Sequence, residues 1–213
     1  MKNARKLPVQ AKASIAFVFA SLFSQGMAFI TMPIFTRLLT TAEMGYVTTY
    51  NAWQVMLGAV VGLSLSSGSF NIAMMKFADK RDQYESSILT LSFIPSTVFL
   101  LIAIVFREPL ANMMGLSEFL LILMAIVFIF SPGFNFWLLR QRYEYKYKLA
   151  GALTMGSALA STIFSVIVVL YLNKAGSDQV AVGRLYATNI ATMAISAVIW
   201  IKIYAKGKTI VNI

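Results

Sequence analysis

The chain has 213 residues, of which 59% are hydrophobic and only 12% are charged, and its mean hydropathy is +0.75. A soluble domain is typically about 45–50% apolar and about 25% charged, so this composition excludes an ordinary soluble domain and predicts a membrane protein. The chain contains no Cys and no His, which excludes thiol and imidazole catalysis, disulfide bonds and the common zinc sites. We expect neither a metal nor a cofactor.

Six apolar stretches are long enough to cross a hydrocarbon core, which takes about 20 helical residues. None of the six contains Asp or Glu, and Lys and Arg begin where the stretches end. Backbone amides inside a bilayer must hydrogen bond within their own segment, so each stretch is predicted to be a helix. The sequence therefore predicts an all-α, polytopic membrane protein with a single membrane domain over 1–213 and six spans at 14–35, 47–70, 87–106, 119–139, 149–172 and 185–203.

Basic residues lie mostly on one side of these spans. All of the 18 Lys and Arg residues except Arg37, Arg107, Lys174 and Arg184 fall in the N-terminal segment, the second and fourth loops and the C-terminal segment. The positive-inside rule therefore predicts that both termini are cytoplasmic. The first stretch is longer than the 7–15 apolar residues of a signal peptide, so we interpret it as a membrane helix that is retained.

Small and polar residues recur at helical spacing in four of the predicted helices, which is typical of faces buried in a bundle. The helices at 87–106 and 119–139 are mostly aliphatic and aromatic, so we expect them to face lipid, with kinks at Pro95 and Pro132. The polar and small residues that share a face in the other four helices are Ser21, Ser24, Gln25, Ala28, Thr31 and Thr36, then Asn51, Gln54, Gly58, Gly62 and Ser69, then Gly151, Thr154, Ala158, Ser161, Thr162 and Ser165, and finally Asn189, Thr192 and Ser196.

Two kinds of residue within these faces are interpreted differently. We expect Gly58 and Gly62, which form a GxxxG pair, and Gly151, Ser161 and Ser165 to pack helices together. Four amides need hydrogen-bonding partners at membrane depth, and either a neighbouring helix or a water-filled cavity can supply them. These candidates for a substrate cavity are Gln25, Asn51, Gln54 and Asn189.

Arg37 is the charged candidate for the same cavity. It follows the first apolar stretch near the outer interface, and on a straight helix it points away from the Ser21–Gln25 face. One interpretation is an interfacial arginine that extends its head group into water. In the other, Pro33 rotates the last turn and brings Arg37 towards the cavity as a cationic ligand for an anionic substrate.

The segment between the fourth and fifth spans alternates cations with tyrosines. Such a pattern also occurs in proteins that bind nucleic acid, but a loop between two membrane helices is expected to carry aromatic residues and inner-face cations. Attraction to anionic lipid headgroups, about 1 kcal/mol per cation, is sufficient to explain it. We therefore expect no nucleic-acid partner and an inner-face basic loop that contains Arg140, Arg142, Lys146 and Lys148.

Catalysis is not expected from this sequence. Membrane-embedded enzymes need paired carboxylates, histidine clusters or an activated nucleophile, and no acid lies inside a predicted span. The same absence argues against a self-contained ion-coupled antiporter, because proton- or sodium-driven carriers commonly hold an acid at membrane depth.

Three short motifs resemble bacterial polysaccharide-biosynthesis flippases of the multidrug/oligosaccharidyl-lipid/polysaccharide exporter superfamily. They are the Arg-Leu-Leu turn at Arg37 followed by Glu-x-Gly-Tyr at Glu43, the Ser-Ser-Gly-x-x-Asn run at 66–71, and the Tyr-rich basic loop at 140–148. The family usually has Gly-Pro just before that Glu, whereas this chain has Thr41-Ala42.

The resemblance implies two six-helix lobes around a central cavity, of which this chain matches the first. It implies translocation of undecaprenyl-diphosphate-linked oligosaccharides across the bacterial cytoplasmic membrane, by a truncated or half-length form. Arg37 and the polar faces of the first two helices would then contact the diphosphate and the sugar. Expected partners are the lipid-linked oligosaccharide, membrane lipids, and a second lobe, a homodimer partner or polysaccharide polymerases and transferases.

Two other functions are compatible with the same pattern. A multidrug-type exporter of the superfamily would share the fold but is expected to carry an acid at membrane depth. A scaffold subunit that does not transport would need only packing faces and a basic inner surface.

Overall fold

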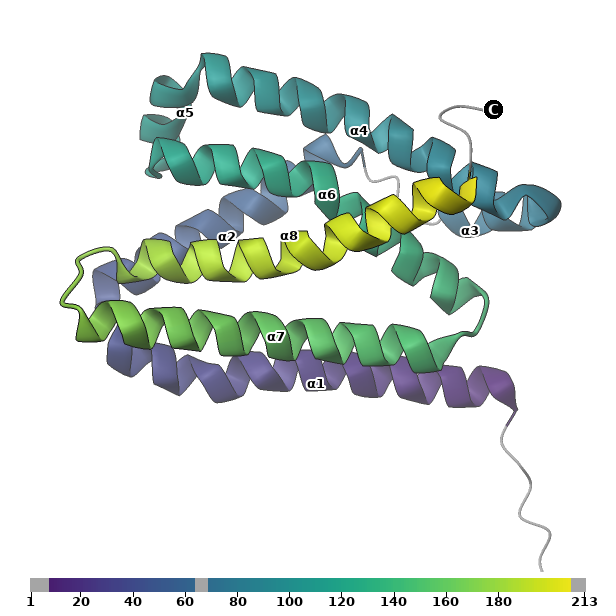
Figure 1. Cartoon of the computed structure of the whole chain (residues 1–213), viewed down its shortest axis with the longest axis horizontal. Coiled ribbons are helices and arrows are strands. Elements are labelled where there is room, and N and C mark those ends of the chain that lie inside the picture. The colour runs from purple at the N-terminus through teal and green to yellow at the C-terminus, as the bar shows by residue number, and fades with distance from the viewer. Residues whose placement is uncertain (1–7, 64–68, 208–213) are drawn as a thin grey trace, which may run out of the picture.

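The computed structural model describes residues 8–63 and 69–207, and every regular element in this part of the chain is helical (Figure 1). A short 3₁₀ turn, η1, covers Ala78–Lys80. The α-helices are α1 (Val9–Leu38), α2 (Thr41–Val61), α3 (Ser69–Lys76), α4 (Arg81–Val105), α5 (Arg107–Met114), α6 (Glu118–Tyr143), α7 (Tyr147–Lys174) and α8 (Val180–Gly207).

Five helical segments in the described residues are long and apolar enough to cross a membrane. They are α1, η1 with α4, α6, α7 and α8. This result confirms an all-α protein of the multi-pass membrane type, while the count of six spans stays a prediction.

α2 differs from the helix predicted over 47–70. It begins earlier, at Thr41, and ends at Val61, where Gly62 is the C-cap. Residues 64–68 of the predicted helix lie outside the described residues, and α3 begins at Ser69. The polar residues Thr48, Thr49, Asn51 and Gln54 reduce the hydropathy of α2, which explains why it is not among the five apolar segments.

The first turn of α2 is fixed by a capping box. The Thr40 side chain accepts a hydrogen bond from the Glu43 backbone N–H (3.3 Å), and the Glu43 carboxylate accepts one from the Thr40 backbone N–H (2.8 Å). This reciprocal pair satisfies two N–H groups that a helix start otherwise leaves unpaired. Glu43, a residue of the quoted motif, therefore has a structural role at a helix end.

α6 is the central helix of the bundle, which corrects the expectation that it faces lipid. In the most apolar 18-residue stretch of α6, 50% of the residues are buried, whereas the share is 11% in the corresponding stretches of α1 and α7. It packs against both α8 and α4, and Leu120, Leu121 and Met124 are fully buried on it. Lipid tails are as apolar as leucine, so an aliphatic helix suits the core and the lipid equally, and hydrophobicity alone does not distinguish the two.

The remaining long helices lie on either side of α6 and α8. α1 packs along α7, and α7 packs against α8 (Figure 1). α4 lies beyond α6 and exposes many large apolar residues, including Ile94, Val98 and Leu101. The expectation of a lipid-facing helix therefore suits α4 better than α6.

Three of the long helices, α1, α4 and α6, contain a proline in their interior without being interrupted. Pro33 lies in α1, Pro95 in α4 and Pro132 in α6. α6 bends midway along its length (Figure 1), as expected for a proline that removes a backbone hydrogen bond. The next residue, Gly133, lies against α8, where an added Cβ would be 3.1 Å from the Cβ of Trp200. α6 and α8 thus cross in close contact beside the bend.

The chain places the starts of α1, α4 and α7 and the ends of α6 and α8 at one end of the bundle (Figure 1). This is the end at which the predicted inner-face cations of the described residues gather, and we call it the basic end. The opposite end holds the connections α1–α2, α4–α6 and α7–α8. This arrangement agrees with the distribution of Lys and Arg, which are frequent in every second connection of the sequence and sparse in the others.

Candidate functional site

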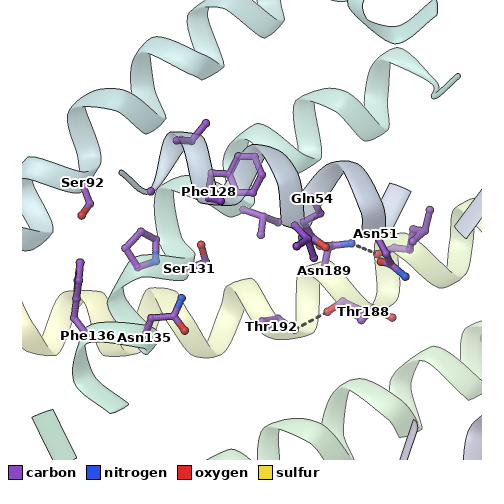
Figure 2. Close-up of a pocket in the computed structure, with 18 of the residues that line it drawn as sticks. Asn51, Gln54, Ser92, Phe128, Ser131, Asn135, Phe136, Thr188, Asn189 and Thr192 are labelled. Atoms are coloured by element: carbon purple, nitrogen blue, oxygen red, sulfur yellow. Dashed lines mark hydrogen bonds between the residues drawn. The ribbon is translucent and has the colours of Figure 1, made fainter. Parts of the chain in front are cut away.

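A cavity of about 670 Å³, which we call the polar cavity, lies between α2, α6 and α8, with Ser92 reaching it from α4 (Figure 2). Its walls carry apolar residues such as Val127, Phe128 and Phe136, but polar groups come from all four helices. The polar and charged residues of the lining are Asn51, Gln54, Ser92, Ser131, Asn135, Arg184, Thr188, Asn189 and Thr192. The polar cavity is therefore amphipathic, in a bundle whose outer surface is mostly aliphatic.

Three of the four amide candidates meet in this cavity. Gln54 Nε2 donates a hydrogen bond to Asn189 Oδ1 at 3.0 Å, and Asn189 Nδ2 donates to the Leu185 carbonyl at 2.8 Å. Asn51 lies on α2 one turn before Gln54 and lines the same cavity (Figure 2). From the sequence, these amides could either line a cavity or form hydrogen bonds between helices. Gln54 and Asn189 line the cavity and also form a hydrogen bond between α2 and α8.

The cavity also contains a cation that the sequence interpretation places in a loop. Arg184 lies in α8, which begins at Val180, whereas the predicted span begins at 185. Arg184, Thr188 and Thr192 follow at intervals of four residues and line the cavity together, because residues four apart share a helix face. That spacing is visible in the sequence, but the predicted helix starts one residue too late to include the arginine.

The guanidinium of Arg184 has no acidic partner within the described residues. It stacks over the Phe35 ring, with 3.7 Å between its central carbon and the ring centroid, and its Nη1 lies 3.6 Å from the Met44 sulfur. Among the residues that the structure describes, no carboxylate lies within 4.0 Å of it. A partly buried arginine has several N–H donors and stays charged, so this one can receive an anion that enters the cavity.

Arg37 and Gln25 lie elsewhere. Arg37 is exposed in the last turn of α1 and is not part of the cavity lining, which agrees with the interfacial interpretation. Gln25 is exposed on α1, where its amide donates a weak hydrogen bond to the Ser21 carbonyl at 3.4 Å. Because α1 packs on α7 rather than beside α2, the polar faces of the first two helices do not form one wall.

The predicted packing residues have different surroundings. An added Cβ at Gly58 would be 3.4 Å from the Phe128 ring, so Gly58 allows α2 to approach α6, while Gly62 caps α2. Gly151 faces Ala20, which places it between α7 and α1. Ser165 is buried, and Ser161 donates to the Ala158 carbonyl at 3.2 Å within α7.

The basic end contains a network of ion pairs that involves two residues of the predicted basic loop, Arg140 and Lys146. Arg140 Nη1 binds Glu85 at 2.6 Å and also Asp82, and Arg140 Nε binds Glu144 at 3.0 Å. Glu144 also accepts a hydrogen bond from Lys146. Arg140 is thus neutralised within the protein instead of facing lipid headgroups, while Arg142 and Lys148 are exposed.

The helix that contains the predicted span at 87–106 also contains an acid, Glu85, just before that span begins. α4 with η1 extends from Ala78, so it includes Glu85, which is 2% exposed. The predicted span begins at 87, since hydropathy falls at the first acid. The carboxylate of Glu85 is paired with Arg140, which balances its charge inside the bundle.

The pKa of Glu144 is lowered from its ordinary value. Burial by itself would raise this pKa, but the hydrogen bonds from Lys146 and Arg140 favour the carboxylate and outweigh it. Glu144 follows the last residue of α6, and its charged form joins the α6 end to the loop that comes next.

A scan against protein-family models, a search of curated proteins and a search of solved structures each found no match to this chain.

Proposed function

We propose that the chain is one lobe of a flippase that moves undecaprenyl-diphosphate-linked oligosaccharides across the bacterial cytoplasmic membrane for polysaccharide biosynthesis. The observation that carries this proposal is the polar cavity, with its amides, its hydroxyls and Arg184, inside a bundle of apolar helices. Polar groups at membrane depth are expensive and usually mark a substrate path.

The lining suits the parts of such a substrate. The amides of Asn51, Gln54 and Asn135 both donate and accept hydrogen bonds, as sugar hydroxyls require, and the aromatic ring of Phe128 offers an apolar surface. Arg184 supplies the cation for a diphosphate, because its planar fork matches phosphate oxygens. The polyprenyl tail would stay in lipid, and relative rocking of two lobes would alternate the access to the cavity.

Arg184 replaces Arg37 as the residue proposed to contact the diphosphate. Both lie towards the end of the bundle opposite the basic end, but only Arg184 lines the cavity. This difference provides a matched pair of variants. We expect Arg184→Gln to lower polymer export at least about tenfold, the value of one lost charge-assisted contact, and Arg37→Gln to leave it near the wild-type level.

The experiment measures polymer export in cells that depend on this protein, with membrane levels measured by immunoblot. Asn51→Ala and Gln54→Ala are also expected to reduce export at normal membrane levels. If all three cavity variants export normally, the flippase proposal is overturned in favour of a scaffold subunit. If export of cationic drugs falls in place of polymer export, the activity is that of a multidrug-type exporter.

A further inference from the structure

A second cavity, separate from the polar cavity, runs along α1 and ends at the C-terminus of α6. It has a volume of about 580 Å³. Its α1 side is formed by Ala13, Ser14, Phe17, Val18, Ser21, Leu22 and Gln25, and Arg142 and Tyr145 lie at its end. Val18 and Leu22 are 59% and 61% exposed, so the groove is open to the surroundings of the bundle. Most of its lining along the helix is apolar, with Ser14, Ser21 and Gln25 as the polar residues, and Arg142 makes it cationic at the basic end. We call it the α1 groove.

Arg142 is the one charged residue among the described residues that line the α1 groove. Its guanidinium carbon lies 5.5 Å from the centroid of the Phe17 ring. Within the described part of the chain it has no carboxylate within 4.0 Å, since the neighbouring Glu144 is bound by Arg140 and Lys146. The hydrogen-bond donors of Arg142 therefore remain available, whereas those of Arg140, two residues earlier, are used.

Tyr145 has an unusual backbone conformation beside this arginine. The end of α6 forms a Schellman motif, in which Lys146 N–H donates to the Gln141 carbonyl (2.9 Å) and Tyr145 N–H to the Arg142 carbonyl (3.2 Å). Tyr145 takes the left-handed position of this motif, with φ 54°. α5 and α7 end with the same pair of hydrogen bonds, but there the left-handed residues are Gly115 (φ 66°) and Gly176 (φ 65°).

A side chain at this position strains the backbone, which glycine avoids. Strained positions cluster at functional sites, which makes Tyr145 a candidate for one. Tyr145 is 47% exposed and contributes little to the core. The Tyr145 side chain lines the α1 groove. A glycine at this position would relieve the strain but would remove this side chain from the groove.

We propose that the α1 groove binds an anionic phospholipid of the inner leaflet. Arg142 holds the phosphate through its planar fork, the Tyr145 hydroxyl is a second donor, and one acyl chain lies along Val18 and Leu22. The charge of the groove selects an anionic over a zwitterionic lipid. Arginines and tyrosines at the inner interface are suited to this depth of the bilayer. This proposal is independent of what the polar cavity transports.

The test uses the full-length protein, purified in detergent and exposed to an equimolar mixture of phosphatidylglycerol and phosphatidylcholine. Native mass spectrometry counts the lipids that each protein retains. We expect the wild type to retain phosphatidylglycerol preferentially and Arg142→Ala to reduce its retention by about tenfold, as expected for one charge-assisted phosphate contact. Lys148→Ala is the control, because Lys148 is exposed in the same basic loop but does not line the groove.

Tyr145→Gly separates binding from folding. Glycine relieves the strain at the left-handed position, so the unfolding temperature should stay equal or rise, while phosphatidylglycerol retention should fall severalfold. Val18→Trp, which fills the groove without changing charge, should also lower retention. The proposal is overturned if both lipids are retained equally, if Tyr145→Gly and Val18→Trp retain as much as the wild type, or if Lys148→Ala has the effect of Arg142→Ala.

Discussion

Arg140 and Arg184 are both partly buried arginines near helix ends, but their surroundings are opposite. At the basic end, Arg140 is held by Asp82, Glu85 and Glu144. In the polar cavity, Arg184 has an aromatic ring and a sulfur as its neighbours and no carboxylate within reach among the described residues. A cation whose charge is balanced within the protein stabilises the fold, whereas one that is left unbalanced beside a cavity is available to a ligand.

The position of a cation in the sequence therefore does not reveal its role. Arg140 belongs to a basic loop that is predicted to face headgroups, and two of its three carboxylate partners come from α4, more than fifty residues away. Arg184 falls in a predicted loop and lines the polar cavity. The partners, and not the residue type, separate the two roles.

The largest expected effect is from Arg140→Ala. Removal of one partner from a buried ion pair leaves the other charge uncompensated and costs about 3–5 kcal/mol, because Glu85 is 2% exposed. We expect a lower free energy of unfolding in detergent micelles, followed by circular dichroism, and lower membrane levels. The double variant Arg140→Met with Glu85→Leu should recover most of the loss. A single variant as stable as the wild type would contradict the structural role of Arg140.

A pH titration tests the same network with a smaller effect. The pKa of Glu144 is lower in the folded protein than in the unfolded chain, so the carboxylate contributes stability that is fully present above the unfolded value, about 4.3. That stability is lost as the pH falls through the lower folded pKa.

We therefore expect Glu144→Gln to be less stable than the wild type at neutral pH and to show a weaker loss of stability on acidification below about pH 4.3. Thermal unfolding at several pH values measures this difference. Parallel pH profiles for the two proteins would show that Glu144 is not stabilised as a carboxylate.

Arg184→Gln is expected to change stability less than either of these. A stacked arginine on an aromatic ring contributes about 0.5–1 kcal/mol when it is partly exposed to solvent, and no carboxylate is left unpaired when it is removed. The free energy of unfolding should fall by no more than that amount, while polymer export falls at least about tenfold. A destabilisation as large as that of Arg140→Ala would remove the contrast between the two arginines.

The smallest expected effect concerns the hydrogen bond between Gln54 and Asn189, which joins α2 to α8 at 3.0 Å. Hydrogen bonds between membrane helices average about 0.6 kcal/mol in double-mutant cycles. We expect a coupling energy near this value from Gln54→Ala, Asn189→Ala and the double variant, measured by unfolding in micelles. A coupling above about 2 kcal/mol would mean that these amides are structural and are not free to bind a substrate.

Much of the fold could be predicted from the sequence because it depends on local properties. Long runs of apolar residues produce helices in a bilayer whatever they pack against, so α1, α4, α6, α7 and α8 are expected, with ends displaced by a few residues. The periodic polar residues of α2 and α8 also identify Asn51, Gln54 and Asn189, because helical spacing places them on one face.

Only the tertiary structure decided which helix is central and which polar faces meet. α6 is buried although its composition suits lipid, since leucine is compatible with both surroundings. The polar face of α1 is separated from that of α2 because α1 packs on α7.

For the arginines too, the sequence determines the approximate position and the tertiary structure determines the partners. That Arg37, Arg140 and Arg184 lie near membrane interfaces follows from the sequence, because a charge ends each apolar run. The carboxylates of α4 that bind Arg140 and the Phe35 ring beneath Arg184 lie on other helices, at distances along the chain that no local pattern encodes. The sequence by itself thus determined that the chain forms apolar helices with a basic end, and tertiary packing decided which cation is paired and which faces the cavity.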